Sequence, residues 1–420
     1  MVHPDPEPLS HGPDGGPPIR VCYVISHFHP RASGAERQAL LQGAELARRG
    51  HTAMVVTRAI DGQRRDEVIQ GVTVHRWVDP PAHGPLFGLG FVAGVVGSLM
   101  RLKGEFDLVH THQALWESIA AGLARPLLGG RPTLIQPASS GYYGEAQEMA
   151  RTKGYPLLRR LAASNTAYAA ISADIERQWL ALGVPPSRMI RTASGVDDRH
   201  FRPGPSAVEA SLPPRPRVVF TGRLHPQKNL PALLEAWVEV ASRSSANLVL
   251  VGDGPDRSAL ESMTLDLNIA DRVHFAGAVD DPAEHLRAAD AFVLPSLAEG
   301  MSNSLLEAMA TALPCVASDI GGNTDLIVDG VEGLLVDPGD PRALAAAILG
   351  LIEEPSRASA IGAAARARVE ERFGIGAVVD GYVSLYRRLL RGEPAGAGGG
   401  FAPGRVLSAT SSPIPRRSLG

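Results

Sequence analysis

Short apolar runs that end in polar loops, each followed by a helical pattern, recur along this chain and constrain its fold most strongly. The first run, "IRVCYVIS" at 19–26, is followed by a helical pattern at 35–50 and by a second apolar run at 52–57. Continuous apolar runs are typical of parallel strands that are buried on both faces. Strand, helix and strand in succession therefore predict a βαβ array in the first half of the chain.

The same pattern restarts near residue 216. The expected strands include "PRVVFTGRL", "ANLVLVGDGP", "AFVLPS" and "PCVAS", and the expected helices include "LPALLEAWVEVAS" and "SLLEAMATA". A Pro-rich stretch at 201–217 separates the two arrays. We predict an α/β protein with two Rossmann-like, doubly wound domains that face a central cleft, since open sheets bind ligands at the carboxyl ends of their strands.

Composition narrows the class of protein. A chain of 420 residues is too long for one ordinary domain, and its net charge of −3 gives no reason to expect a nucleic-acid partner. Cys22 and Cys315 lie in apolar runs, which favours buried thiols and a reducing compartment. The first 18 residues lack the apolar core of a secretory signal, so we expect a cytoplasmic protein.

Candidate binding residues lie in the loops that follow the strands. Ser302, Asn303 and Ser304 open a helix, whose first N–H groups and dipole favour an anion. Gly34 allows close approach of the backbone. Together with Arg223 and Lys228 these residues suit a diphosphate without a metal, and the sequence contains no Asp-x-Asp pair. Taken singly, each feature is equally typical of a helix cap, a turn or a solvated charge.

No GxGxxG follows the first strand, so a dinucleotide oxidoreductase has no support. Instead, the second half resembles the donor domain of glycosyltransferase family 4, whose members are retaining enzymes with the GT-B fold. The resemblance is carried by the ordered series "FTGRLHPQKNLPALLEAW", "LVLVGDGPDRSALE", "VHFAGAVDD" and "AFVLPSLAEGMSNSLLEAMATALPCVASDIGG". The first half matches more weakly, through "HFHPRASGAERQ" and "ISADIERQWLALGVPPSRMIRTASGVDDRHFRPG", where Ser194 replaces the usual Asn.

The resemblance assigns roles to residues of the second half. It implies that Glu299 faces the hydroxyls of the donor sugar and that Glu307 holds the nucleotide ribose. It places the phosphates against the segment between them, which comprises Gly300, Met301, Ser302, Asn303 and Ser304. It also implies that Arg223 and Lys228 neutralise the diphosphate, that Gly34 lies beneath it, and that the backbone from Gly277 to Val279 reads the base.

The first half is expected to bind the acceptor. His110 and His112 end the strand "FDLVHTH", and His112 can orient sugar hydroxyls, although a capping or packing role suits either histidine equally. Many relatives carry a histidine that faces the donor sugar where "PTLIQPAS" here places Gln136, an amide that both donates and accepts. We include His112 and Gln136 with Glu299 among the candidate catalytic residues.

The resemblance also predicts the domain organisation. We expect a disordered start at 1–18, an acceptor-side domain at 19–200 and a donor-binding domain at 201–375. We expect a C-terminal helix at 376–391 that returns to the first domain, followed by a disordered tail at 392–420.

The function implied is a retaining transfer of sugar from a nucleotide-diphosphate donor, most often a UDP-sugar in this family, to a glycan, a lipid-linked saccharide or a small molecule. No cofactor or metal is expected. Front-face attack, in which the departing phosphate oxygen takes the acceptor's proton, needs no protein nucleophile. The alternatives are a GDP-sugar (mannosyl) transferase and a sugar-nucleotide-binding pseudoenzyme.

A peripheral contact with the inner face of the membrane is a further expectation. The segment "PLFGLGFVAGVVGSLM" at 85–100 is too short and too rich in glycine to span a bilayer, and predicts a buried or interfacial helix. Arg151, Lys153, Arg159 and Arg160 supply charge for anionic lipid or a lipid-diphosphate acceptor, although a solvated helix face explains them as well.

Overall fold

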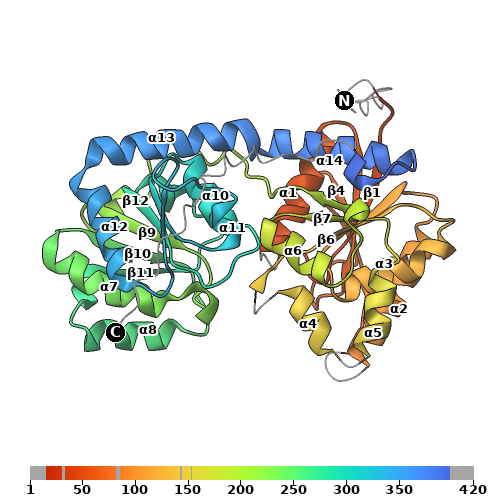
Figure 1. Cartoon of the computed structure of the whole chain (residues 1–420), viewed down its shortest axis with the longest axis horizontal. Helices are drawn as coiled ribbons and strands as arrows, with labels where there is room; N and C mark the ends of the chain where they lie inside the picture. The colour runs from red at the N-terminus through yellow and green to blue at the C-terminus, as the bar shows by residue number, and fades with distance from the viewer. Residues whose placement is uncertain (1–15, 31–33, 82–85, 142–143, 153, 398–420) are drawn as a thin grey trace, which may run out of the picture.

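The computed structural model contains two parallel β-sheets, each flanked by helices (Figure 1). It describes residues 16–30, 34–81, 86–141, 144–152 and 154–397. Of the predicted disordered ends, 1–18 and 392–420, residues 1–15 and 398–420 lie outside these ranges. Residues 31–33, 82–85 and 142–143 and Lys153 also lie outside them.

The first sheet has eight strands in the order β3-β4-β2-β1-β5-β6-β7-β8. All neighbours are parallel except β3 and β4, which form an antiparallel pair at one edge. The strands are β1 (Arg20–Val24), β2 (Thr52–Arg58), β3 (Asp66–Ile69), β4 (Val72–Val78), β5 (Leu108–His112), β6 (Thr133–Gln136), β7 (Ala167–Ala170) and β8 (Met189–Arg191).

The second sheet has six parallel strands in the order β11-β10-β9-β12-β13-β14. They are β9 (Arg217–Thr221), β10 (Asn247–Val251), β11 (Val273–Gly277), β12 (Ala291–Leu294), β13 (Cys315–Ser318) and β14 (Leu334–Val336). The central strands β9 and β10 are buried throughout, and β1 is buried except at Arg20, as their continuous apolar runs predict. The predicted α/β class with two doubly wound halves is therefore confirmed.

Helices pack on both sheets and join their strands. In the first half they are α1 (Gly34–Arg48), α2 (Phe87–Arg101), α3 (Trp116–Leu127), α4 (Glu145–Arg151), α5 (Tyr155–Ala162) and α6 (Ala173–Ala181). In the second half they are α7 (Leu230–Arg243), α8 (Arg257–Asp266), α9 (Ala283–Arg287), α10 (Asn303–Ala310), α11 (Gly321–Thr324), α12 (Pro341–Glu353), α13 (Pro355–Arg372) and α14 (Ile375–Leu390). Short 3₁₀ turns are η2 (Pro186–Arg188), η3 (Glu209–Ser211), η4 (Pro226–Lys228), η5 (Ala270–Arg272) and η6 (Ala395–Ala397).

The last two long helices connect the two halves. Figure 1 shows α13 beside the second sheet and α14, in darker blue, beside the first. α13 packs against α10, whereas α14 packs against α1. The backbone N–H of Ile375 at the start of α14 donates to the carbonyl of Val196 at 2.8 Å, which fixes the crossing point. α14 therefore brings side chains encoded at the end of the chain to the first sheet.

The segment at 85–100 forms α2, a helix of 15 residues with four glycines. Gly88 lies against the indole of Trp116, where a Cβ would meet ring atoms at 2.4 Å, so α2 packs closely on α3. Within the described ranges, every helix falls short of the length and apolar content that crossing a bilayer requires.

Candidate functional site

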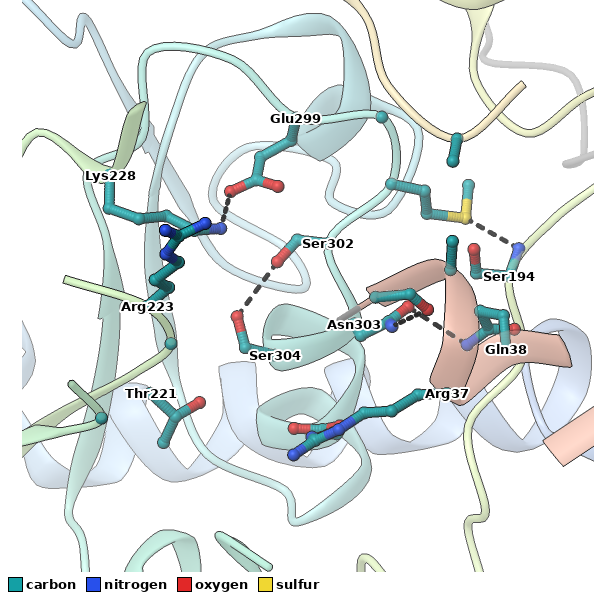
Figure 2. Close-up of a pocket in the computed structure, with 18 of the residues that line it drawn as sticks. Arg37, Gln38, Ser194, Thr221, Arg223, Lys228, Glu299, Ser302, Asn303 and Ser304 are labelled. Carbon is teal, nitrogen blue, oxygen red and sulfur yellow. Dashed lines mark hydrogen bonds and ion pairs between the residues drawn. The ribbon is translucent and has the colours of Figure 1, made fainter. Parts of the chain in front are cut away.

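A cavity of about 530 Å³ lies between the carboxyl ends of the two sheets. From the first half, its wall includes the start of α1, the end of β6 and the segment around Ser194. From the second half, the loops after β9, β10, β11 and β12 complete it. Figure 2 shows side chains from both halves converging on this space. The size suits a ligand in the range of a nucleotide sugar.

The first turn of α10 forms one wall of the cavity. Ser302 is the N-cap residue, and its hydroxyl accepts a hydrogen bond from the backbone N–H of Leu305 at 3.3 Å. The Ser302 and Ser304 hydroxyls lie 3.1 Å apart (Figure 2). The N-terminal N–H groups of a helix lack partners within the helix, and the helix dipole adds positive potential there. This wall is therefore suited to an anion.

Two cationic side chains face α10 from the loop after β9. Lys228 lies in η4, and its Nζ is 2.5 Å from Oε1 of Glu299 (Figure 2). The same Glu299 oxygen accepts a hydrogen bond from the Ser296 hydroxyl at 2.7 Å. Arg223 is exposed to the cavity and forms no ion pair with any described residue. The arrangement offers one paired and one free cation beside a helix N-terminus, which matches the charge of a diphosphate.

Glu307 lies one turn farther along α10 and is almost completely buried. Burial raises the pKa of its carboxyl to about 7, and the nearby Arg37 guanidinium opposes this only in part. Arg37 belongs to α1, and its Nη1 lies 3.4 Å from Oε1 of Glu307. A costly buried carboxylate at the wall of a cavity is typical of a functional site.

Hydrogen bonds join the two halves around the cavity. The Asn303 amide donates to the carbonyl oxygen of Gly34 at 3.0 Å, and Gln38 donates to Asn303 Oδ1 at 3.1 Å. The hydroxyl of Ser140 donates to the carbonyl of Glu299 at 2.6 Å. At Gly300 a Cβ would lie 2.1 Å from the Ala138 carbonyl oxygen, so only glycine permits this approach. The segment that carries Glu299, Gly300 and Asn303 is thus held directly by the first half.

Gln136 ends β6 and lines the cavity, although only 3% of its surface is exposed. Its Oε1 accepts a hydrogen bond of 2.6 Å from the hydroxyl of Tyr382 on α14. His112, at the matching position of β5, is buried beneath this layer and is not among the cavity-lining residues. The His112 ring packs edge-on against Tyr23 and beside His110, and burial lowers its pKa to about 3.

Most of the predicted site residues surround the one cavity. Those that line it are Gly34, Gln136, Arg223, Lys228, Val279, Glu299, Gly300, Met301, Ser302, Asn303, Ser304 and Glu307. Gly277 does not line it, but its φ of +79° and its carbonyl, which accepts from Gly252 N at 2.7 Å, shape the loop that carries Val279. The roles given to these residues stay predictions.

Several lining residues were not among the predicted ones. Arg37 and Gln38 follow Gly34 within about one turn of α1, so their proximity to this predicted site residue was a usable signal. Thr221 precedes the basic loop, and its buried hydroxyl has no hydrogen-bond partner among the described residues. The backbone N–H of Ser194 donates to the sulfur of Met301 at 3.2 Å, and no local sequence pattern predicts this contact.

The described part of the chain contains no group of three or more His, Cys, Asp or Glu side chains placed to hold a metal ion. The expectation of a metal-free site remains a prediction.

Comparison with known structures identifies the class of fold. Anabaena HepE in complex with UDP-glucose matches with a TM-score of 0.73 and 20% identity, covering 87% of this chain and 99% of HepE. Sucrose-phosphate synthase from Thermosynechococcus elongatus matches with a TM-score of 0.75 and 22% identity, covering 89% and 100% of the two chains. Two facing parallel sheets of this kind define a GT-B protein.

Sequence comparison identifies the family. Residues 33–195 match the model for the glycosyl transferase 4-like domain, and residues 215–354 match the model for glycosyl transferases group 1. D-inositol 3-phosphate glycosyltransferase of Rhodococcus opacus is 32% identical, over 88% of this chain and 90% of the relative. N-acetyl-α-D-glucosaminyl L-malate synthase of Bacillus anthracis is 25% identical, over 88% and 97%. The chain therefore belongs to glycosyltransferase family 4 and is a glycosyltransferase.

Proposed function

We propose that this glycosyltransferase moves a sugar, with retention of configuration, from a UDP-sugar to an acceptor bound by the first half. One observation carries the proposal: Lys228, Arg223, the first turn of α10 and Glu307 surround a single cavity at the edge of the second sheet. Cations and helix N–H groups stabilise the negative charge that develops on a departing diphosphate. UDP and UDP-glucose occupy a structural relative of the same fold, which supports uridine as the base.

Roles within the site follow from chemistry and position. Glu307 binds the two ribose hydroxyls, and Glu299 binds hydroxyls of the donor sugar, since each carboxylate oxygen accepts from a neighbouring hydroxyl. The backbone around Val279 contacts the base. Lys228 exchanges part of its ion pair with Glu299 for the diphosphate oxygens when the donor binds. In front-face attack the departing oxygen takes the acceptor's proton, so no protein nucleophile is required.

The test is a ligand screen followed by a turnover assay. Thermal unfolding is measured with UDP, GDP and their common sugar conjugates, because only a ligand that binds the folded state raises Tm. UDP release is then followed with candidate acceptors, and D-inositol 3-phosphate and L-malate are included because two relatives are named for them. Stabilisation by GDP alone would redirect the proposal to GDP-sugars.

A pseudoenzyme is the alternative outcome of the same assay. Gln136 retains a donor and an acceptor group, so we expect turnover without a histidine at this position, and little change of rate in Gln136→His. A protein that binds UDP-sugar without turnover, but gains turnover on Gln136→His, would instead be a non-catalytic binder.

We further propose that the protein is cytoplasmic and that it contacts an anionic membrane surface, where a lipid-linked acceptor would reside, through α2 and α3. Leu86, Leu89, Ala93, Gly97 and Met100 are all exposed, and their spacing places them on one face of α2. That face carries no charge before Arg101. An exposed apolar stripe of this kind usually marks an interaction site.

Neighbouring residues extend the apolar face and add positive charge. Leu127 of α3 is half exposed, and its carbonyl accepts a hydrogen bond from Lys103 Nζ at 2.8 Å. α5 packs against α3 and exposes Arg159 and Arg160 (Figure 1). Apolar side chains bordered by cations are the combination that anionic headgroups attract, and this favours lipid over a second copy of the chain.

Sedimentation with phosphatidylglycerol and phosphatidylcholine vesicles at low salt tests the contact. Leu89 is 70% exposed, so Leu89→Glu should abolish binding without unfolding the protein. Leu265→Glu is the matched control, because Leu265 is 68% exposed on α8, which belongs to the second half. Equal binding of both variants, or no binding by the natural protein, would remove the proposal. If the natural protein does not bind lipid but is a dimer, and Leu89→Glu is a monomer, the exposed face of α2 would instead contact a second copy of the chain.

A further inference from the structure

Two tyrosines of α14 reach side chains on the adjacent strands β5 and β6 of the first sheet. Tyr382 and Tyr386 are four residues apart and therefore lie on the same face of the helix. The Tyr382 hydroxyl donates to Gln136 Oε1 at 2.6 Å, while the Tyr386 hydroxyl lies 2.7 Å from Nδ1 of His110. All four side chains are buried. Only Gln136 of the two strand residues lines the cavity.

The Tyr382 contact decides which end of the Gln136 amide is free. A primary amide has one oxygen that accepts and one NH₂ group that donates. The Tyr382 hydroxyl has a single proton, and its shorter contact is with the amide oxygen, whereas Oγ1 of Thr192 lies 3.2 Å away and can donate back to the phenol oxygen. The buried His110 side chain also interacts with the Gln136 amide. With its oxygen engaged by Tyr382, Gln136 directs its NH₂ group to a ligand in the cavity.

We propose that Tyr382 is a positioning residue that fixes Gln136 as a hydrogen-bond donor to the bound nucleotide sugar. This inference rests on the proposed sugar transfer. Without the tyrosine hydroxyl the amide can rotate and present its oxygen, which repels the oxygens of a departing diphosphate. Because negative charge on that group grows in the transition state, the loss falls on kcat more than on KM. A residue of α14, near the end of the chain, thus determines that Gln136 of the first half donates a hydrogen bond to the ligand.

Tyr382→Phe is the direct test, with UDP-glucose as the donor and UDP release as the readout. The natural protein is assayed first, and absence of turnover with every UDP- and GDP-sugar would overturn the proposed function rather than this inference. Given turnover, we expect Tyr382→Phe to lower kcat about three- to tenfold, as for the loss of one neutral hydrogen bond, with KM for the donor within twofold. Unchanged kcat would overturn the inference.

Tyr386→Phe is the matched control, because it removes an equally buried hydroxyl from the same face of α14, and this hydroxyl reaches Gln136 only indirectly, through His110. It should leave kcat within twofold. In a Gln136→Ala background, Tyr382→Phe should have no further effect on kcat, since two residues that act through one contact are not additive. Additive losses, or equal losses in both tyrosine variants, would indicate a general loosening of α14 and contradict the positioning role.

Gln136→Glu tests the direction of the hydrogen bond. A carboxylate still accepts from Tyr382, but it replaces the NH₂ donor by a charged oxygen. We expect kcat to fall at least tenfold and further than in Gln136→Ala. A Gln136→Glu variant as active as the natural protein would show that the NH₂ group contacts no oxygen of the donor.

Discussion

Replacing Glu307 by glutamine separates the free-energy cost of burying this carboxylate from its proposed role in binding the nucleotide. Its pKa of about 7 exceeds the ordinary 4.5 because the group is buried, so the folded protein holds this proton more tightly than the unfolded chain does. The free energy of unfolding therefore falls as pH rises from about 4.5 to about 7. At about 1.4 kcal/mol per pH unit, the loss amounts to about 3 kcal/mol and is complete above pH 7.

Glu307→Gln keeps the size of the side chain and removes the charge. Above pH 7 the variant should be more stable than the natural protein without nucleotide. Unfolding entropy of about 2.1 cal/mol/K per residue makes a gain of about 3 kcal/mol equivalent to a Tm rise of roughly 3 °C for this chain. This gain already includes the loss of the ion pair with Arg37, because the guanidinium is one of the groups that set the pKa of about 7.

The same substitution should weaken UDP binding, because an amide replaces the carboxylate that we propose accepts from both ribose hydroxyls. Loss of one hydrogen bond to a charged group costs about 1.5–3 kcal/mol, or roughly 10- to 150-fold in Kd. The variant should thus combine a higher Tm alone with a smaller Tm increase on adding UDP. No purely structural carboxylate would give this combination.

The assay is thermal unfolding between pH 5 and pH 8, with and without UDP. Glu332→Gln is the control, because Glu332 is a buried carboxylate that pairs with Arg368 at 3.2 Å, away from the cavity. Glu332→Gln removes the negative charge that pairs with Arg368 and should lower Tm, with the UDP effect intact. A lower Tm in Glu307→Gln at pH 8, or an undiminished response to UDP, would refute the reasoning.

Three further predictions address the rest of the site. UDP should raise Tm equally with and without EDTA, and a strict requirement for Mn²⁺ or Mg²⁺ would contradict the metal-free diphosphate site. Lys228→Ala should weaken UDP binding in calorimetric titration, whereas Glu299→Ala should mainly lower kcat, and equal effects on both quantities would show that the two roles are not separate. His112→Phe should keep activity. It should also reduce the free energy of unfolding that is lost as pH falls from 6.5 to 3, since burial lowers the pKa of His112 to about 3 and the unfolded chain therefore binds this proton more tightly. Loss of turnover in this variant would instead support a catalytic histidine.

The buried strands could be predicted because each apolar run must lie between two helical layers. "IRVCYVIS" and "PRVVFTGRL" correspond to β1 and β9, which are central in their sheets. The edge pair β3 and β4 was missed, since β3 is mostly exposed and reads as a polar segment. Its hairpin did have a signal: Gln70 and Gly71 both have positive φ, as a two-residue turn requires.

The parts of the candidate site that lie at the ends of neighbouring strands could be predicted from the sequence. The parts that depend on contacts between distant segments could not. The loops after β9 and β12 meet because carboxyl ends of parallel strands share one edge, so Lys228 and Glu299 were predicted together. In contrast, the contacts of Gln136 and His110 depend on Tyr382 and Tyr386, about 250 residues away on a helix that crosses between the halves. No local pattern shows whether a histidine at a strand end faces the cavity or such a helix.

The most direct test of the central claim is proton NMR of UDP-sugars incubated with the protein, which reports both cleavage of the donor and the anomer released. In a panel of UDP-glucose, UDP-galactose and UDP-N-acetylglucosamine, with GDP-mannose for comparison, we predict slow UDP release from one donor even with water as the acceptor. The first sugar product should be the α-anomer, as retention requires, and Lys228→Ala should release less UDP. A β-anomer as the first product, or no cleavage of any donor with any acceptor, would contradict a retaining UDP-sugar transferase.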